Sequence, residues 1–275
     1  MKNKVLIICY LLLAICHFTG CATNIRMRAV NLPSEEHTVR LILPSHIEEP
    51  LKSFNVGEEL TYDIGWNGIP VGYASMSIKA VEKIGDRDVY VIESTARSNE
   101  FLSKIYPIED IYRTYIDTKK MIPLKFEKKT RDGRHTSHDL VEFDHDKKVA
   151  HYTSLKTGEK KDVLIAEGMQ DMLSCIYYFR MLDLKVDEKI PCKVYVREKI
   201  YDLLVNVEGF EYVTIKNLGN FYAFKVQPLA SFRGIFISRG KGWILVSTDK
   251  DRLPIAARIK VAPFGSITCV LTKKD

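Results

Sequence analysis

Four histidines and five carboxylates in the middle of the chain are the side chains best suited by type to metal binding or acid–base catalysis. The histidines are His135, His138, His145 and His151, and the carboxylates are Glu109, Asp110, Glu127, Glu142 and Asp144. Their segments alternate polar and apolar residues, which is typical of strands. Two imidazoles three apart on a strand point to opposite faces, so His135 and His138 are poorly placed to share a metal ion. Carboxylates that alternate with lysines favour a solvated outer face, so we predict no metal site and no catalytic residues.

Recognised catalytic and cofactor-binding motifs are absent from the sequence. There is no Gly-x-Ser-x-Gly elbow, phosphate-binding glycine loop or His-Glu-x-x-His, and Gly240-Lys241-Gly242 has Leu245 where a dinucleotide fingerprint needs a third glycine. We therefore predict a protein that is not an enzyme and that uses no cofactor. The net charge of +6 over 275 residues is mild and is not gathered in an arginine-rich arm, so we do not expect nucleic acid as a partner.

A run of basic residues stands out within this charge distribution. Its members are Lys119, Lys120, Lys125, Lys128, Lys129, Arg131 and Arg134. One interpretation is a solvated hairpin. The other is contact with lipid phosphates or anionic glycans, because each exposed cation near an anionic surface contributes about 1 kcal/mol.

Cys21 is the residue for which the sequence predicts a specific covalent modification. Lys2 and Lys4 precede the uncharged apolar run 5–15, the layout of a secretory signal, and the run is too short to span a bilayer comfortably. It ends at Phe18-Thr19-Gly20-Cys21, which resembles the bacterial lipobox, whose cysteine is acylated before cleavage ahead of it. We expect residues 1–20 to be a lipoprotein signal peptide and Cys21 to be lipidated. An ordinary signal followed by an incidental cysteine is the alternative.

Acyl chains on Cys21 predict a mature protein that is attached to a membrane without spanning it, because two or more chains anchor stably. Ala22 follows the cysteine and favours the outer membrane, with the protein facing the periplasm. Three further cysteines, Cys175, Cys192 and Cys269, remain in the mature chain. They are an odd number in an oxidising compartment and match no zinc-site spacing, so we predict buried free thiols.

The rest of the chain divides into a tether and one β domain. Residues 21–53 lack sustained periodicity and are interrupted by Pro33, Pro44 and Pro50, which favours a tether. From there to residue 275 polar and apolar residues alternate in repeated short runs separated by turn residues, as in Ala74 to Ala80 and Ile255 to Val261. Short turns favour antiparallel neighbours. The pattern therefore predicts a single curved β-sheet domain over 54–275.

One segment has helical periodicity. Between residues 168 and 184, Met169, Met172, Leu173 and Ile176 follow i, i+3, i+4 and i+7 spacing, and Phe179 lies on a second apolar stripe. A helix that is apolar over so much of its circumference should be enclosed by other elements. The fold class we predict is all-β dominated: a long, strongly curved antiparallel sheet, an open or incomplete barrel, with one enclosed α-helix near 168–184.

Two stretches carry a resemblance to a known family. They are Tyr62-Asp63-Ile64-Gly65-Trp66-Asn67-Gly68-Ile69-Pro70-Val71-Gly72, and Gln170-Asp171-Met172-Leu173-Ser174 with Tyr177-Tyr178-Phe179-Arg180. Across about residues 54–273 the chain resembles the exported bacterial family known as domain of unknown function 3108. The family has no settled activity, so the resemblance implies a fold and no mechanism. Asp171 and Arg180 are too far apart to pair on one helix face, so we expect each to tie the helix to the sheet.

The fold expectation leads to two hypotheses about function. In the first, the curved sheet of a membrane-anchored periplasmic lipoprotein binds an acyl chain or another apolar envelope ligand, with the helix as a lid. The ligand-binding residues would be Met76, Ile78, Met169, Met172, Leu173, Ile176, Phe179, Phe224 and Ile259. In the alternative, the core is filled and the protein is a protein-interaction scaffold in the cell envelope. Partners are then the membrane through the N-terminal acyl chains and an envelope lipid or an envelope protein.

Overall fold

The structure is a computed structural model that describes residues 54–232, 235–236, 242–261 and 265–275; for residues 230–232, 235–236 and 261 it describes only the backbone. The predicted signal peptide, Cys21 and the predicted tether at 21–53 lie outside the described residues. No helix within the described ranges has both the length and the apolar character needed to cross a bilayer.

Strands make up most of the described chain. The first half contains β1 (Glu59–Trp66), β2 (Ile69–Ile84), β3 (Arg87–Ser98), helix α1 (Glu100–Ser103), β4 (Ile108–Asp117), β5 (Pro123–Asp132), β6 (His135–Asp144), β7 (Val149–Ser154) and β8 (Lys160–Leu164). The second half contains β9 (Gln170–Asp171), helix α2 (Ser174–Met181), β10 (Lys189–Val196), β11 (Lys199–Ile215), β12 (Gly219–Phe232), β13 (Ile235–Phe236), β14 (Gly242–Ser247), β15 (Pro254–Val261) and β16 (Gly265–Lys274).

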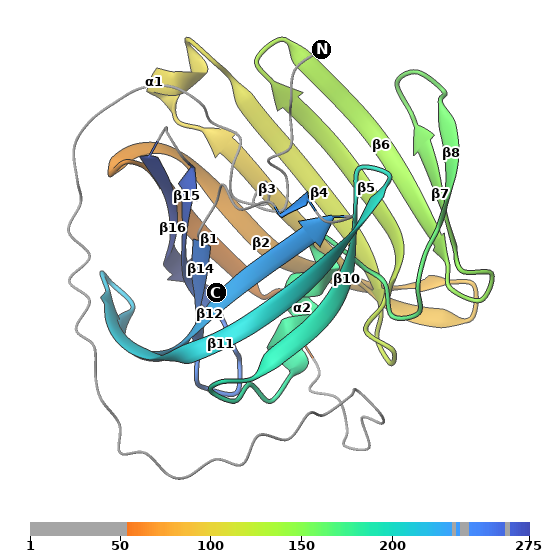
Figure 1. The fold of residues 1–275 in the computed structure, drawn as a ribbon. Coiled ribbons are helices and arrows are strands. Elements are labelled where there is room, and N and C mark those ends of the chain that lie inside the picture. Colours follow the sequence, from red (N-terminus) through yellow and green to blue (C-terminus); the bar gives the residue numbers. More distant parts are fainter. Residues whose placement is uncertain (1–53, 233–234, 237–241, 262–264) are drawn as a thin grey trace.

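All of these strands belong to one sheet. Its order is β8-β7-β6-β5-β4-β3-β2-β1-β16-β15-β14-β12-β11-β10-β9, with β13 paired to β12. Every pair is antiparallel except β9 with β10, as expected for strands joined by short turns. The pairing of β1 with β16 joins the two halves of the chain. Figure 1 shows the sheet curling around α2. The predicted fold class is thereby confirmed.

Bulges and close backbone contacts shape the curve. The register shifts between Ile64 and Gly65, between Ile78 and Ala80, and between Val207 and Gly209. Such bulges bend a strand and increase its twist. β11 is one continuous strand of 17 residues that is bulged at Gly209. Gly72 faces the carbonyl oxygen of Arg97 so closely that an added Cβ would lie 2.3 Å from it.

The helix is shorter than its periodicity predicts. Only Ser174–Met181 is helical, because Gly168 has a φ of +67° and Gln170–Asp171 are extended and pair with β10. The Asp171 carboxylate accepts hydrogen bonds from the backbone N–H groups of Leu173 and Ser174, both at 2.7 Å, and so defines where the helix begins. Met169 and Met172 are core residues outside the helix, since burial alone does not require helical structure.

The three cysteines are free thiols, as predicted. Cys192 and Cys269 are buried and Cys175 is half-buried. Burial raises the pKa of all three thiols, to about 12 for Cys192. The thiols are therefore protonated at neutral pH and weakly reactive, which is typical of structural cysteines.

Candidate functional site

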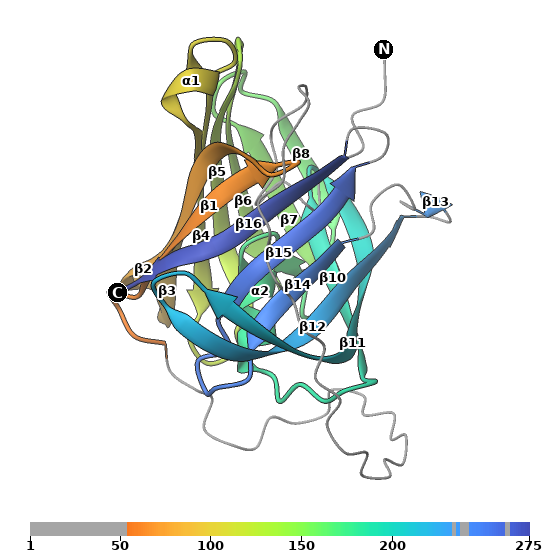
Figure 2. The same cartoon turned by 90° about the vertical axis from the view of Figure 1, so that its left-hand side faces the viewer.

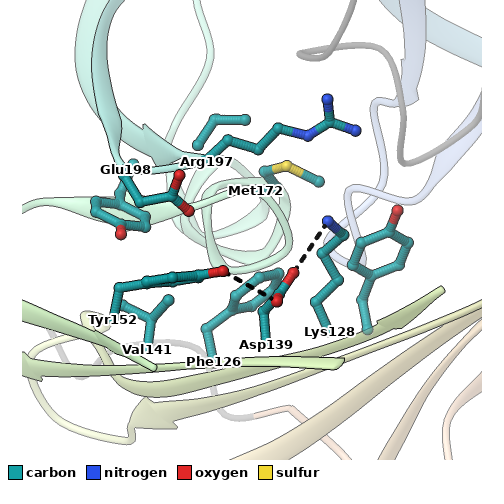
Figure 3. Close-up of a pocket in the computed structure, with 11 residues that line it drawn as sticks. Phe126, Lys128, Asp139, Val141, Tyr152, Met172, Arg197 and Glu198 are labelled. Carbon is teal, nitrogen blue, oxygen red and sulfur yellow. Dashed lines mark hydrogen bonds and ion pairs between the residues drawn. The ribbon is translucent and has the colours of Figure 1, made fainter. Parts of the chain in front are cut away.

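A polar cluster lines the inner face of the sheet where β5, β6 and β7 lie side by side. Lys128 and Asp139 are cross-strand neighbours, and the Lys128 Nζ lies 3.4 Å from Asp139 Oδ2. The Tyr152 hydroxyl donates to Asp139 Oδ1 at 3.1 Å. Figure 3 shows the Asp139 carboxylate between the lysine and the tyrosine. Lys128 and Tyr152 therefore both donate to the Asp139 carboxylate.

The turn between β10 and β11 closes the cluster from the other side. Its two central residues, Arg197 and Glu198, have φ values of 48° and 53°. This is the left-handed geometry of a tight hairpin turn that Asn and Gly adopt most easily, and other residues in it cost on the order of 1–3 kcal/mol each. Burial raises the pKa of the Glu198 carboxyl. The strained turn holds a charged side chain against the inner face of the sheet.

The space within this cluster is small. The cavity has a volume of about 30 Å³ and is lined by Tyr112, Phe126, Lys128, Asp139, Val141, Tyr152, Met172, Tyr195, Val196, Arg197 and Glu198. A cavity needs about 10–15 Å³ to hold one water molecule, so this one has room for water and not for an organic substrate. The lining residues bring together strands near the two ends of the sheet, β5 to β7 and β10 to β11.

Asp110 lies on β4, close to this cluster. Its position contradicts the prediction that the carboxylates form a solvated outer face. The side chain is buried, and burial raises its pKa to about 6 even though the Tyr112 hydroxyl donates to it at 3.3 Å. Lys128 points inward in the same way. The parity of the strand would have revealed Asp110, because Ile108, Asp110 and Ile116 share one face of β4 and all are buried.

A second buried network ties β9 and α2 to the sheet. The Thr114 hydroxyl donates to Asp171 Oδ2 at 2.5 Å, and Gln170 Nε2 donates to the carbonyl oxygen of Met121 at 3.0 Å. Arg180 forms two bonds with Glu58, at 2.6 and 2.7 Å. These contacts confirm the prediction that Asp171 and Arg180 attach the helix segment to the sheet.

These tethers lie in Gln170 to Arg180, one of the two stretches that carry the family resemblance; the other stretch is the β1–β2 hairpin. The family model described as Protein of unknown function (DUF3108) matches residues 61–272. The chain belongs to the DUF3108 family. Within this DUF3108 protein, the hairpin turn is made by Asn67 and Gly68, whose φ values are 48° and 84°. The characteristic residues of both stretches therefore have structural roles in this chain.

Comparison with solved structures agrees with the fold of this DUF3108 protein. A β-barrel-like protein of domain of unknown function DUF1849 from Brucella abortus has a TM-score of 0.53 at 10% identity, with 80% of this chain and 97% of that chain covered. A protein described as exported, with a YmcC-like fold, from Bacteroides fragilis has a TM-score of 0.34 at 9% identity, with 82% and 98% covered. No curated protein matches the sequence. The first likeness concerns the fold alone.

The nine predicted ligand-binding residues all lie in or against the core of the DUF3108 domain. Ile78, Met169 and Leu173 have no exposed surface at all. Met76, Met172 and Phe224 are buried, and Ile176, Phe179 and Ile259 are half-buried and pack against the core. Zero exposure means that no water-sized space touches the side chain, so Ile78, Met169 and Leu173 do not line an open cavity. For the other six, a ligand-binding role stays a prediction.

His138, His145 and His151 each contact a different partner. His138 Nε2 lies 2.7 Å from Glu127 Oε1, and His151 Nδ1 lies 2.8 Å from Asp162 Oδ1. His145 lies 2.7 Å from the carbonyl oxygen of Pro123. Within the described part of the chain, no group of three or more His, Cys, Asp or Glu side chains is placed to hold a metal ion.

Proposed function

We propose that this DUF3108 protein is a non-enzymatic lipoprotein of the cell envelope that acts as an interaction scaffold. It is anchored through acyl chains on Cys21, in the outer membrane and facing the periplasm. The observation that carries the scaffold role is the filled interior of the curved sheet. Leu173 precedes α2 directly and has no exposed surface, and Ile78 on β2 is equally enclosed. This burial supports a core that is filled by the helix segment.

Binding of an acyl chain or another apolar envelope ligand is the second candidate. It is favoured by Ile176, Phe179 and Ile259, which keep part of their surface exposed at the edge of the same core. A ligand there would contact the helix without displacing Leu173. The two candidates differ in whether the domain binds an acyl chain in solution.

Replacing Leu173 with tryptophan tests whether the core is filled. In a filled core the added volume should lower the free energy of unfolding by about 1–3 kcal/mol, measured by chemical denaturation. Val81→Trp on the exposed face of β2 is the matched control and should leave stability nearly unchanged. The scaffold role also requires that the unmodified protein shows no saturable binding of a fluorescent fatty acid. Saturable binding of the fatty acid that Ile176→Trp reduces would establish the second candidate instead, and unchanged stability of Leu173→Trp would show that the core is not filled.

The anchor has its own test. Cys21→Ala should block processing at that position and leave an unprocessed precursor, because the modified thiol is required before cleavage. The unmodified protein should enter the detergent phase on phase partition. Normal cleavage of the variant, with the unmodified protein in the aqueous phase, would show that the signal is an ordinary one.

A further inference from the structure

The loop between β3 and β4, residues 99–107, presents apolar side chains to solvent at one end of the molecule. Phe101 is 74% exposed and Ile105 is 66% exposed. These two exposed apolar side chains lie within one short loop. Figure 2 shows α1, the centre of this loop, at the top of the molecule, above the C-terminus. We call residues 99–107 the apolar tip.

Hydrogen bonds hold the apolar tip in one conformation. The Asn99 side chain accepts from the Leu102 N–H at 2.9 Å and donates to the carbonyl oxygen of Pro70 at 2.8 Å. The Ser98 and Ser103 hydroxyls lie 2.7 Å apart. The Ser98, Asn99 and Ser103 side chains are thereby paired, whereas Phe101 and Ile105 face solvent beside the exposed charged residues Glu100 and Lys104. Large apolar side chains exposed together in one loop favour an interaction site.

A basic groove adjoins the apolar tip on the outer face of β4, β5 and β6. It has a volume of about 530 Å³, and its lining includes Lys129, Arg131, Lys156 and His138, with Glu109 as its one carboxylate. Glu109 and Arg131 are cross-strand neighbours next to the end of the ladder that leads into the tip. The Tyr106 ring lies against Gly133, where an added Cβ would be 2.8 Å from the ring. The tip and the groove therefore form one surface.

The cations of the groove are available to an anionic partner. Lys156 Nζ is positioned by Thr136, whose carbonyl and hydroxyl oxygens accept from it at 3.1 and 2.7 Å. These are neutral acceptors, so the charge is not cancelled. Among the described residues, neither Lys129 nor Arg131 has a carboxylate within ion-pair distance. The basic run in the sequence thus divides: Lys128 points into the core and pairs with Asp139, whereas Lys129 and Arg131 face outward.

We propose that the apolar tip and the basic groove together dock the domain on an anionic lipid bilayer. Phe101 and Ile105 would enter the interface, while Lys129, Arg131 and Lys156 contact headgroup phosphates. Apolar side chains flanked by cations suit this surface, because each cation near anionic headgroups contributes about 1 kcal/mol. The inference rests on the proposed function in one respect, because the proposed anchor on Cys21 keeps the domain near a bilayer.

The geometry of the chain permits such docking beside a lipid anchor. The first strand starts next to the C-terminus, where Glu59 N donates to Asp275 O at 3.3 Å. From there to the tip the 8 residues of β1 cover about 26 Å, because the far end of β1 pairs with Ile69 close to the tip. The chain from Cys21 to Ser53 can span at most about 110 Å. That length exceeds the distance the anchor must cover for the tip to reach the same bilayer.

Quenching by lipids with brominated acyl chains tests the proposal on the full chain reconstituted into phosphatidylglycerol-containing vesicles. Ile105→Trp places an indole in the tip, and Tyr222→Trp places one on an exposed position of β12 as the matched control. The signal of the parent protein, with its own two tryptophans, is subtracted. We expect the indole at position 105 to be quenched and that at position 222 to be unaffected.

The groove is tested in the same vesicles. Lys129→Gln with Arg131→Gln should reduce the ratio of docked to undocked protein by about 30-fold, as expected for two cations of about 1 kcal/mol each. Lys216→Gln with Lys250→Gln, two exposed lysines elsewhere, should not change it. An unquenched indole at position 105 in protein that still floats with the vesicles would overturn the docking proposal and leave the anchor intact. Protein that does not stay with the vesicles at all would instead contradict the proposed anchor. Quenching that is equal in phosphatidylcholine vesicles and insensitive to the groove variant would overturn the role of the cations.

Discussion

Replacing Arg180 with methionine should lower the free energy of unfolding by about 3–5 kcal/mol, the usual cost of removing one partner of a buried ion pair. The Arg180 side chain is 2% exposed and that of Glu58 is 13% exposed. The guanidinium makes two bonds to the carboxylate and lies 4.9 and 5.0 Å from the ring centres of Phe54 and Tyr177. Methionine keeps much of the packing and leaves the Glu58 charge without its partner.

Two comparisons separate the ion pair from general packing. Lys83→Met breaks a surface pair whose side chains are 69% and 47% exposed, and it should cost less than about 1 kcal/mol. The double variant Arg180→Met with Glu58→Leu removes both charges, and it should be more stable than Arg180→Met alone because no buried charge is left unpaired. Chemical denaturation measures all three. A cost for Arg180→Met no larger than that for Lys83→Met would contradict the assignment.

Replacing Asp171 with alanine should lower the free energy of unfolding by about 2–4 kcal/mol at pH 7. The carboxylate is fully buried and accepts from the Thr114 hydroxyl and from two backbone N–H groups at the start of α2. Alanine leaves these donors buried without partners, and each such group costs about 1–3 kcal/mol. Asp171→Asn is the matched control, because its amide oxygen still accepts and its NH₂ can donate to Thr114. We expect it to remain within about 1 kcal/mol of the unmodified protein.

The pH dependence of stability, compared between the unmodified protein and Asp171→Asn, tests the protonation of the Asp171 carboxyl. Burial raises the pKa of Asp171 from 3.8 to about 6. Between these values the folded protein binds a proton that the unfolded chain has released, so this group makes stability fall as pH rises from about 4 to about 6. Asp171→Asn lacks this contribution. Its stability relative to the unmodified protein should therefore increase over that range and level off above pH 7, and a constant difference would contradict the raised pKa.

The residue pattern was sufficient for the overall architecture of the domain. Period-two alternation and short turns are local properties, because successive side chains of a strand point to opposite faces wherever that strand lies. They predicted a long antiparallel sheet and one enclosed helix, and the Gln170 to Arg180 segment identified the family. The alternation did not predict a strand at Lys160–Leu164, because β8 begins with charged residues and lies at an edge of the sheet.

The beginning of α2 depended on contacts distant in sequence. Met169, Met172 and Leu173 have helical spacing, yet only Leu173 directly adjoins the helix, since Gln170 and Asp171 pair with β10. Hydrogen bonds to Met121 and Thr114 stabilise that extended segment. No local pattern reports such partners, because they lie about fifty residues away.

The polar cluster and the filled core were likewise decided by tertiary structure. Alternation shows that Lys128 and Glu127 face opposite ways, but it does not say which face becomes the interior of a curved sheet. The curl of the sheet turns Lys128 and Asp139 inward beside the β10–β11 turn and leaves Lys129 and Arg131 outside with the apolar tip. Whether α2 fills the sheet or covers a cavity depends on the distance between facing strands. Bulges, twist and side-chain volumes over the whole sheet together set that distance. No single segment of the sequence contains this information.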